Sequence, residues 1–355
     1  MRDPLAARIE ISRAALLHNV RSLRARLGPD RMIAAVLKGN AYGHGRDLVG
    51  GIVAEHVDLL AAADPVDAVA LARLAPGKAL SLGPAHGAIL AECIARGVRV
   101  AVSDQRQLDG LDQRTRVHLL VDTGVHRLGV APQRAEGFAH AIRASGAQIE
   151  SAFCMVARAD YGDWDAVAEE VRLLRELPLG VACFHTGGSS VVLERPDLAG
   201  QIGRPGLALL GYHPRRHQRD LVDLQPSLRL IAPILELRIV PAGDSVGYQA
   251  RRLERETVVA TLPIGVAHGL HPCTDSRAVA EVDGMFCPIM HEPSLDYCLL
   301  DVTDAPNAQV GDEAVLLGGR PGSPTSVIDV ANRLGVLVDH VLAPLSASLR
   351  RVAVV

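Results

Sequence analysis

Short apolar runs alternate with amphipathic segments along the first 210 residues of the chain. Eight runs are strand-like, and they cover residues 32–37, 57–61, 79–82, 98–102, 117–121, 149–154, 180–184 and 205–210. Between them, helical periodicity is clearest over residues 64–74, 88–96, 132–144 and 164–174. Strands that alternate with helices indicate a parallel β/α architecture. Eight such units predict a closed (β/α)₈ barrel.

The pattern changes after about residue 228. Strand-like runs now follow one another across Gly, Pro and Asp turns, at residues 231–241, 257–263, 278–282, 297–302 and 313–317. Only residues 326–334 have helical periodicity there. We therefore predict a barrel over residues 9–228 and a β-rich C-terminal domain over residues 229–355, which also includes residues 1–8. A doubly wound open sheet is the alternative fold, but no GxGxxG motif follows the first strand.

Composition narrows the class of protein. The chain has 355 residues, of which 48% are hydrophobic and 22% charged, and its net charge is −3. This is a globular composition without the basic patch that nucleic acids or anionic membranes attract. The N-terminus lacks a signal-peptide core, and no run of about 18 apolar residues predicts a membrane span. We expect a cytoplasmic protein whose six cysteines, which form no CxxC pair, are reduced.

Lysine is rare in this chain, since only Lys38 and Lys78 occur among 37 basic residues. Lysine can form a Schiff base with a carbonyl compound, whereas arginine cannot. Lys78 follows Pro76 and Gly77, so we expect it in a solvated turn. Lys38 ends the first predicted strand, where a (β/α)₈ barrel places catalytic groups. Lys38 is therefore the candidate for covalent chemistry, although a lysine after a strand does not by itself specify a reaction.

The segment around Lys38 adds specificity. Residues 36–45 read VLKGNAYGHG, which closely resembles the motif around the cofactor-binding lysine of the alanine racemase family. Four further segments are similar to family motifs in the same order: VDTGVHRLG at 121–129, RPGLALLG at 204–211, GDSVGY at 243–248 and DVTD at 301–304. The resemblance implies a (β/α)₈ barrel with a β domain and an enzyme that uses pyridoxal 5′-phosphate (PLP).

The resemblance also implies how the cofactor is held. Lys38 would bind PLP covalently as an imine and move a proton at the substrate α-carbon. Tyr42 and Ser189, with the backbone around Gly206 and Leu207, would hold the phosphate. Backbone N–H groups suit that task because they donate hydrogen bonds to anions.

Other matched residues would surround the ring and the substrate. Arg204 would face the pyridine nitrogen, with His185 behind it. A guanidinium does not readily give up a proton, so the ring nitrogen would stay largely unprotonated and the cofactor would be a weaker electron sink. Arg127 would lie near the substrate carboxylate or the phenolic oxygen of PLP, and Leu295 replaces a methionine near the substrate. The family further implies a small amino-acid substrate and a homodimer with shared active sites.

The chain departs from the family where the second proton-transfer group is expected. Racemisation requires proton transfer on both faces of the α-carbon. The tyrosine that serves the second face, in a GYADG-like segment, is replaced by Val266. His268, His271 and Cys273 lie nearby and are candidate replacement acids or bases. A His-x-Cys pair can also bind zinc, but no third ligand is near, so we expect no metal.

Other positions also depart from the family motifs. A lysine before the DTG segment corresponds to Leu120, an asparagine corresponds to Gly188, and a histidine after the sixth strand corresponds to Met155. The residues that anchor the cofactor are kept, whereas groups around the substrate become smaller or apolar. A wider pocket could admit a larger substrate.

Three functions fit these observations. The first is a racemase or epimerase with altered substrate specificity. The second is one-base PLP chemistry on Lys38, as in a decarboxylase, an aldolase or an aminotransferase. The third is a PLP-binding protein with little racemase activity.

Overall fold

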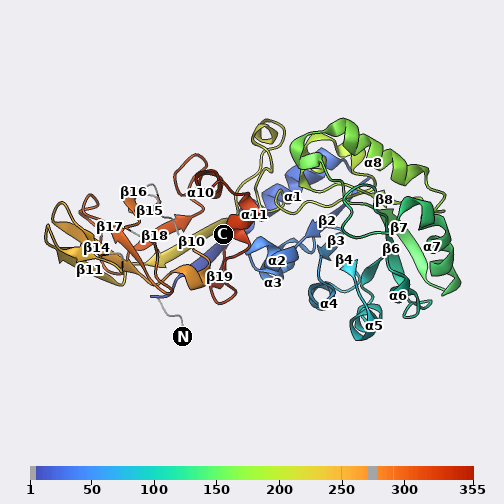
Figure 1. Ribbon diagram of the computed structural model, residues 1–355, viewed down its shortest axis with the longest axis horizontal. Helices are drawn as coiled ribbons and strands as arrows, with labels where there is room; N and C mark the ends of the chain where they lie inside the picture. Colours follow the sequence, from blue (N-terminus) through green and yellow to red (C-terminus); the bar gives the residue numbers. More distant parts are fainter. Residues whose placement is uncertain (1–4, 249, 271–277, 291) are drawn as a thin grey trace. The chain divides into compact units, whose positions relative to one another are not determined.

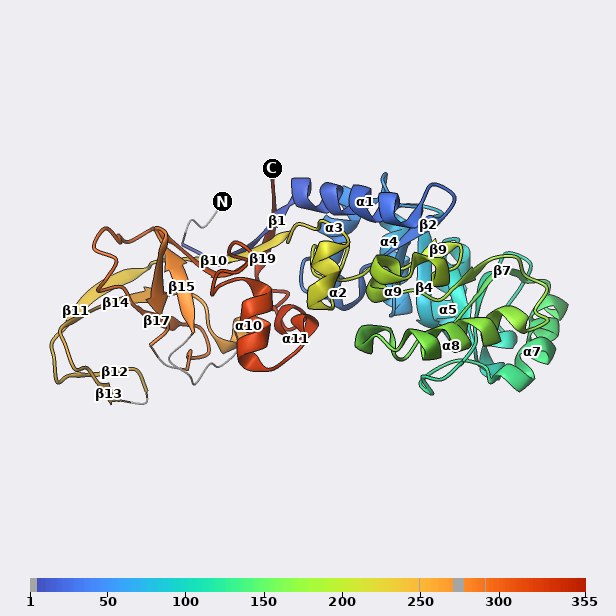
Figure 2. The same cartoon turned by 90° about the horizontal axis from the view of Figure 1, so that it is seen from above.

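The structure is a computed structural model. It describes residues 5–248, 250–270, 278–290 and 292–355 (Figures 1 and 2). None of the helices within these ranges is long and apolar enough to cross a bilayer. The chain forms two compact units, one built from Ala14–Ala41 and Arg46–Gln225, the other from Met1–Arg13, Tyr42–Gly45 and Pro226–Val355.

The first unit is built on an eight-stranded parallel sheet in the order β8-β7-β6-β5-β4-β3-β2-β9. Its strands are β2 (Met32–Val36), β3 (Leu59–Ala62), β4 (Ala79–Pro84), β5 (Arg99–Val102), β6 (Arg116–Leu120), β7 (Gln148–Phe153), β8 (Phe184–His185) and β9 (Ile202–Gly203). The N–H of Gln201 donates to the carbonyl of Phe184 at 2.8 Å, and that of Arg204 donates to Gly187 at 2.9 Å. These bonds join the two edge strands, so the sheet has the barrel-like form that the alternating pattern predicts.

Helices connect the strands and lie outside the sheet (Figure 1). They are α1 (Arg13–Leu27), α2 (Lys38–Tyr42), α3 (Arg46–Val53), α4 (Pro65–Leu74), α5 (Gly87–Ala95), α6 (Gln105–Leu108), α7 (Pro132–Ala144), α8 (Trp164–Glu176) and α9 (Ser189–Glu194), with short 3-10 helices at Ala159–Tyr161, Pro196–Leu198 and Arg216–Asp220. The predicted helices over 64–74, 88–96, 132–144 and 164–174 are α4, α5, α7 and α8.

The last two predicted barrel strands are displaced. Residues 205–210 are not a strand, because they form turns after β9, which is only Ile202–Gly203. The run 180–184 contributes only its last residue to β8. Both strands have two residues, which is too short for a period-two pattern to show in the sequence. The side chains of Leu209 and Leu210 are fully buried, so the run 205–210 is apolar for reasons of packing.

The second unit is mainly β, as predicted. A six-stranded sheet has the order β16-β15-β18-β10-β1-β19, a three-stranded sheet the order β11-β14-β17, and β12 pairs with β13 in a ribbon beyond β11 (Figure 2). The strands are β1 (Arg8–Ser12), β10 (Leu228–Pro233), β11 (Glu236–Val240), β12 (Ser245–Val246), β13 (Arg251–Arg252), β14 (Thr257–Leu262), β15 (Val279–Val282), β16 (Met285–Pro288), β17 (Cys298–Asp301), β18 (Glu313–Leu317) and β19 (Arg350–Val354). Helices α10 (Val327–Leu334) and α11 (Val338–Leu342) and a 3-10 helix at Val266–His268 complete it.

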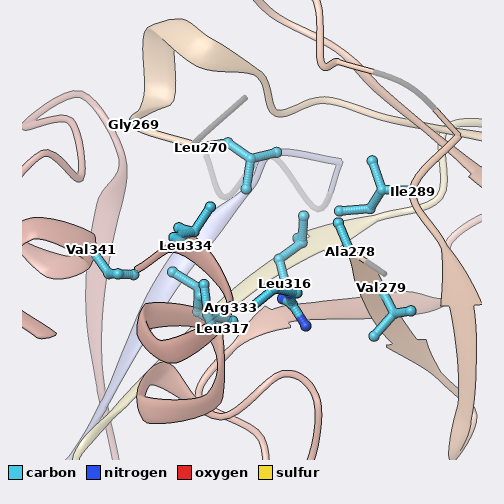
Figure 3. Close-up of a pocket in the computed structure, with 11 residues that line it drawn as sticks. Gly269, Leu270, Ala278, Val279, Ile289, Leu316, Leu317, Arg333, Leu334 and Val341 are labelled. Carbon is cyan, nitrogen blue, oxygen red and sulfur yellow. The ribbon is translucent and has the colours of Figure 1, made fainter. Parts of the chain in front are cut away.

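A small cavity of about 40 Å³ lies in this second unit, between the sheet and helices α10 and α11 (Figure 3). Its lining is almost entirely aliphatic, and Arg333 is the one charged residue among those that line it. None of the residues predicted to bind PLP lines this cavity. It belongs to the apolar core of the unit rather than to a reaction site.

Candidate active site

Residues of the predicted site segments in the barrel unit lie where its strands end. Lys38 follows β2, Asp122 follows β6, Met155 follows β7 and Arg204 follows β9. Because parallel strands end at the same rim of a barrel, these residues share one rim. The rim is the part of such a fold in which catalytic groups lie.

Lys38 begins an unusual turn. Gly39, Asn40, Ala41 and Tyr42 follow it with φ values of 58°, 54°, 53° and 50°, so helix α2 is a left-handed turn. Each residue other than glycine costs about 1–2 kcal/mol in this conformation. Backbone strain of this kind is concentrated at functional sites, where the surrounding structure maintains it. The Lys38 side chain is exposed on the rim.

Local hydrogen bonds hold the turn after Lys38. The N–H of Ala41 donates to the carbonyl of Leu37 at 2.9 Å. The side-chain oxygen of Asn40 accepts a hydrogen bond from the N–H of Arg46 at 2.9 Å, at the first residue of α3. Asn40 tolerates a positive φ better than most residues and also supports the next helix. These contacts stabilise the left-handed turn that follows Lys38.

The other lysine has a structural role. The ammonium group of Lys78 donates to the carbonyls of Ala54 at 2.6 Å and Val57 at 3.0 Å. Both carbonyls follow the end of α3 (Arg46–Val53). Residues 76–77 form the predicted turn, but the Lys78 amine is not simply solvated, because it satisfies backbone acceptors at a helix C-terminus. Of the two lysines, only Lys38 lies at the rim.

Two backbone N–H groups hold the Ser189 hydroxyl in place. The Ser189 hydroxyl oxygen accepts hydrogen bonds from the N–H groups of Gly206 and Ala208, both at 3.1 Å. The Ser189 hydroxyl keeps its own proton to donate elsewhere. A hydroxyl that is held in place and keeps its proton can donate a hydrogen bond to a phosphate group. The sequence predicted Ser189, Gly206 and Leu207, and the structure adds Ala208 as a second residue whose N–H holds the Ser189 hydroxyl in place.

Arg204 is buried, with 3% of its surface exposed. Its Nη1 lies 2.6 Å from Nδ1 of His185 and donates to the His185 carbonyl at 2.7 Å. Its Nη2 donates to the carbonyls of Cys154 at 2.9 Å and Thr186 at 3.2 Å, and to the sulfur of Met155 at 3.3 Å. Among the described residues, no acceptor bonds the Nε–H of Arg204. That N–H is left to bind a ligand atom.

The acceptors around Arg204 are uncharged. Burial lowers the pKa of Arg204 to about 10, which still leaves the guanidinium protonated at neutral pH. Its Nε is therefore a donor, and the ligand atom opposite it must be an acceptor. An unprotonated pyridine nitrogen is such an acceptor. The His185 ring stacks on Phe153 at a centroid distance of 4.6 Å, and the guanidinium carbon lies 5.4 Å from the same Phe153 ring.

The loop after β6 is shaped by Asp122. One carboxylate oxygen of Asp122 accepts hydrogen bonds from the N–H groups of Gly124 at 3.2 Å and His126 at 3.0 Å. Gly129 has a φ of 130°, and a Cβ there would lie 2.5 Å from the N atom of Asp122. Arg127 is exposed in this loop, and no described residue bonds its side chain. Its predicted role near the substrate stays a prediction.

The remaining predicted residues belong to the second unit. Tyr42 is buried at the end of the left-handed turn. Val266 is 40% exposed and Leu295 is 68% exposed. The N–H of Val266 donates to Ser294 at 2.9 Å and that of Ala267 to Leu295 at 3.0 Å, so the two segments lie side by side.

The three candidate replacement groups are described only in part. His268 is half-buried, and its Nδ1 accepts a hydrogen bond from the N–H of Gly265 at 3.1 Å. The proton of a neutral His268 is therefore on Nε2. His271 and Cys273 lie outside the described residues. Within the described part of the chain, no group of three His, Cys, Asp or Glu side chains could hold a metal ion.

The donor set of the barrel rim fits PLP. Lys38 offers an amine for the aldehyde, Ser189 offers its hydroxyl proton for a phosphate, and Arg204 offers one N–H for a ring nitrogen. Each of these groups matches a different part of PLP. A buried guanidinium with neutral acceptors and one N–H left for a ligand is its most specific element.

Comparisons with known proteins agree with this interpretation. The family model of the alanine racemase N-terminal domain matches residues 11–214, and that of the C-terminal domain matches residues 227–353. An alanine racemase of Deinococcus radiodurans is 36% identical over 352 residues, which cover 96% of this chain and 97% of the relative. One of Sorangium cellulosum is 34% identical over 375 residues, covering 97% and 98%.

Solved structures show the same fold. An alanine racemase of Clostridium difficile superposes with a TM-score of 0.91 at 22% identity, covering 100% of this chain and 96% of that one. The biosynthetic alanine racemase of Pseudomonas aeruginosa gives a TM-score of 0.85 at 27% identity, covering 98% and 99%. The chain therefore belongs to the alanine racemase family of PLP-dependent isomerases.

Proposed function

We propose that this protein is an amino-acid racemase or epimerase with a substrate range altered from that of its alanine racemase relatives. The observation that carries the reaction class is Arg204, which presents a single N–H from an otherwise satisfied guanidinium. A donor that keeps its proton leaves the ring nitrogen uncharged and weakens the electron sink. Reactions that need a long-lived carbanion, such as transamination, are disfavoured, whereas rapid reprotonation at the α-carbon is favoured.

PLP, when bound, delocalises the negative charge that develops at the α-carbon of an amino acid. The residues of the chain would divide the remaining work. Lys38 would hold the cofactor covalently and move a proton on one face of the α-carbon. Ser189, through its hydroxyl proton, and the backbone around Gly206 and Leu207 would hold the phosphate, and Tyr42 would assist. Arg127 and Leu295 would lie near the substrate.

The altered substrate range follows from the substitutions in the sequence. Val266 replaces a tyrosine, and the smaller side chain leaves more room beside the α-carbon, whereas Leu295 replaces a methionine of similar volume. Substrates larger than alanine are therefore expected. His268 is the described candidate for the second proton-transfer group, with its Nε2–H as the donor; His271 and Cys273 remain candidates from the sequence.

Val266 supports a second candidate function. A valine side chain has no proton to transfer, so without a replacement the chain has Lys38 as its only base at the α-carbon. Decarboxylation or aldol cleavage would then be accessible, since each needs proton transfer on one face only. A protein that binds PLP with little racemase activity is the third candidate.

The homodimer with shared active sites belongs to this proposal. We propose that the C-terminal domain, residues 229–355 with 1–8, caps the barrel of a partner subunit, as the resemblance implies. A single C₂ contact would complete two sites. A cytoplasmic location also stays a prediction.

Deuterium exchange separates the candidates. The PLP-loaded protein is incubated in deuterated water with a panel of L- and D-amino acids, and the α-proton is followed by NMR and the enantiomer ratio by chiral chromatography. Exchange with inversion is expected for at least one substrate larger than alanine. Exchange without inversion, or release of carbon dioxide or an aldehyde, would instead establish one-face chemistry. No exchange with any substrate would leave only the binding role.

A further inference from the structure

A column of polar side chains runs inside the barrel behind Arg204. Nδ1 of His185 lies 2.6 Å from Nη1 of Arg204, and Nε2 of His185 lies 2.8 Å from Nδ1 of His118. Nε2 of His118 in turn lies 3.9 Å from Oε2 of Glu150. The exposed fractions of His185 and His118 are 0% and 2%. Two buried histidines in contact require a specific arrangement of protons.

The donors and acceptors fix where these protons lie. A guanidinium has N–H donors and no acceptor, so Nδ1 of His185 must be the acceptor in its contact with Arg204. The proton of a neutral His185 is then on Nε2, and it points at Nδ1 of His118. His118 therefore accepts with Nδ1 and carries its own proton on Nε2, facing Glu150. The tautomer of His185 therefore needs both partners, the Arg204 donor at Nδ1 and an acceptor on His118 at Nε2.

Both histidines are neutral in this environment. Burial lowers the pKa of His185 well below its usual value, and the positive charge of Arg204 and the neighbouring His118 act in the same direction. Burial also lowers the pKa of His118, more strongly than Glu150 raises it. A charged imidazole at either position would turn one acceptor into a donor and break the sequence of bonds.

The column ends on a fixed carboxylate. Arg99 Nε donates to Oε2 of Glu150 at 2.8 Å, and Arg116 Nε donates to Oε1 at 2.5 Å. Burial raises the pKa of Glu150, but His118, Arg116 and Arg99 outweigh that effect and lower it to about 2. Glu150 is therefore ionised at neutral pH and oriented by two arginines, with its charge directed towards the Nε2–H of His118.

A proton relay does not explain this column. The column ends at Arg204, and a guanidinium keeps its proton under ordinary conditions. Filling of the barrel interior does not explain it either, because apolar side chains fill such interiors without the cost of burying polar groups. What the column provides is an imidazole whose acceptor nitrogen always faces Arg204.

We propose that His118 is a positioning residue, which holds His185 in the Nε2–H tautomer and so holds the Arg204 guanidinium in place, while Glu150 orients His118. Without an acceptor at His118, the buried Nε2–H of His185 loses its partner. The proton can then move to Nδ1, where it faces the N–H of Arg204 as a second donor. Arg204 would have to shift, and with it the N–H that it offers to the cofactor. The expected effect on cofactor binding rests on the proposed function. The tautomers of His185 and His118 are inferred from their contacts alone.

Nitrogen NMR of the protein without PLP tests the tautomers directly. The 14 histidines are labelled with ¹⁵N, and the His118 and His185 signals are assigned by their loss in single variants. In the wild-type protein both residues should show a protonated Nε2 and a bare Nδ1 across the neutral pH range. In His118→Leu, His185 should show partial or complete protonation of Nδ1. A protonated Nδ1 on His185 in the wild type, or an unchanged His185 in His118→Leu, would overturn the proposal.

Cofactor affinity supplies the second measurement. The asparagine side chain places an acceptor oxygen near the position of Nδ1, so His118→Asn is the conservative variant. Titration of each protein with PLP should show roughly tenfold weaker binding for His118→Leu and near wild-type binding for His118→Asn. His140→Asn, at an exposed histidine of α7, is the control. Equal binding by all variants, or equal losses in both His118 variants, would contradict the positioning role.

These readouts are independent of turnover. A protein that racemises no amino acid but shows the expected tautomers and affinities would contradict the proposed function alone. An active racemase in which His118→Leu retains the wild-type tautomers and affinity would contradict the positioning role alone. His118→Asn and the wild-type spectrum still decide the question if His118→Leu does not fold.

Discussion

Nη1 of Arg204 contacts both Nδ1 and the carbonyl oxygen of His185, at 2.6 and 2.7 Å. This double contact binds a buried cation to a neutral residue instead of to a carboxylate. The nearest fixed negative charge in the column is that of Glu150, on the far side of His118. The arrangement keeps a protonated guanidinium at the barrel rim without neutralising it by a direct ion pair.

Lysine should not replace Arg204. An ammonium has three donors on one atom and cannot reach the acceptors that the planar fork of arginine serves. Arg204→Lys should leave carbonyls of Cys154 and Thr186 without donors and lower the free energy of unfolding by about 1.5–3 kcal/mol, as measured by urea denaturation. An exposed control, Arg134→Lys on α7, should change it by less than about 0.5 kcal/mol. Equal stability of the two variants would show that the contacts around Arg204 contribute little.

The two buried histidines give stability a predictable dependence on pH. Their pKa values are lowered in the folded protein, so below about pH 6.5 the unfolded chain binds protons that the folded chain does not. Stability should therefore fall with acidification, by up to about 1.4 kcal/mol per pH unit for each histidine. His118→Asn should show a shallower decrease between about pH 6.5 and 5 in urea titrations. A slope unaffected by the substitution would mean that His118 is charged in the folded state.

The hydrophobic pattern was sufficient to predict a barrel but not to locate the last two strands that close it. Continuous apolar runs such as 32–37 predict strands because parallel strands are buried on both faces. The run 205–210 misled because apolar residues that pack without forming a strand look the same as a short buried strand. β9 has only two residues, Ile202 and Gly203, and no period can be recognised in two residues.

Part of the site was also visible in advance. Lys38 could be singled out because lysine is rare and because it ends a strand. The role of His118 depends on a neighbour 67 positions away in the sequence, and a single histidine in the apolar run 117–121 does not reveal that neighbour. The available signal was that His118 is a polar residue inside a buried strand. Lys78 was misjudged because the turn that holds it also brings it to the end of α3.

Gly43, which follows the left-handed turn, should not tolerate a side chain. Its φ is 80°, and a Cβ there would lie 2.1 Å from the carbonyl oxygen of Leu342. Its own carbonyl accepts hydrogen bonds from Nε and Nη2 of Arg351 at 3.1 and 2.9 Å. Gly43→Ala should lower the free energy of unfolding by about 2–4 kcal/mol, from overpacking and from the positive φ.

Gly51 provides the matched control for that substitution. It is an exposed residue of α3, and a Cβ there would meet only a leucine methyl of Leu74 at 4.0 Å. Alanine has the higher helix propensity, so Gly51→Ala should raise the free energy of unfolding by about 0.5–1 kcal/mol. Thermal or urea denaturation compares the two variants. Opposite signs are expected, and a neutral Gly43→Ala would mean that the turn can relax.

Restoring the missing hydroxyl tests the importance of Val266. Val266 is 40% exposed, so the folded unit has room for a larger side chain there. Val266→Tyr should increase alanine racemisation by on the order of 100-fold, the lower end of what a positioned acid or base contributes. Val266→Phe adds the ring without the hydroxyl and should give no such increase. Equal rates in both variants would attribute any gain to packing rather than to proton transfer.

The attachment of the cofactor to Lys38 is the central claim, and the chain allows a direct test because it has only two lysines. The protein is loaded with PLP, reduced with borohydride and digested, and the labelled peptide is identified by mass spectrometry. We expect the label on Lys38, its absence from Lys38→Ala, and full labelling of Lys78→Arg, whose structural contacts arginine can keep in part. A label on Lys78, or a label that persists in Lys38→Ala, would contradict the account.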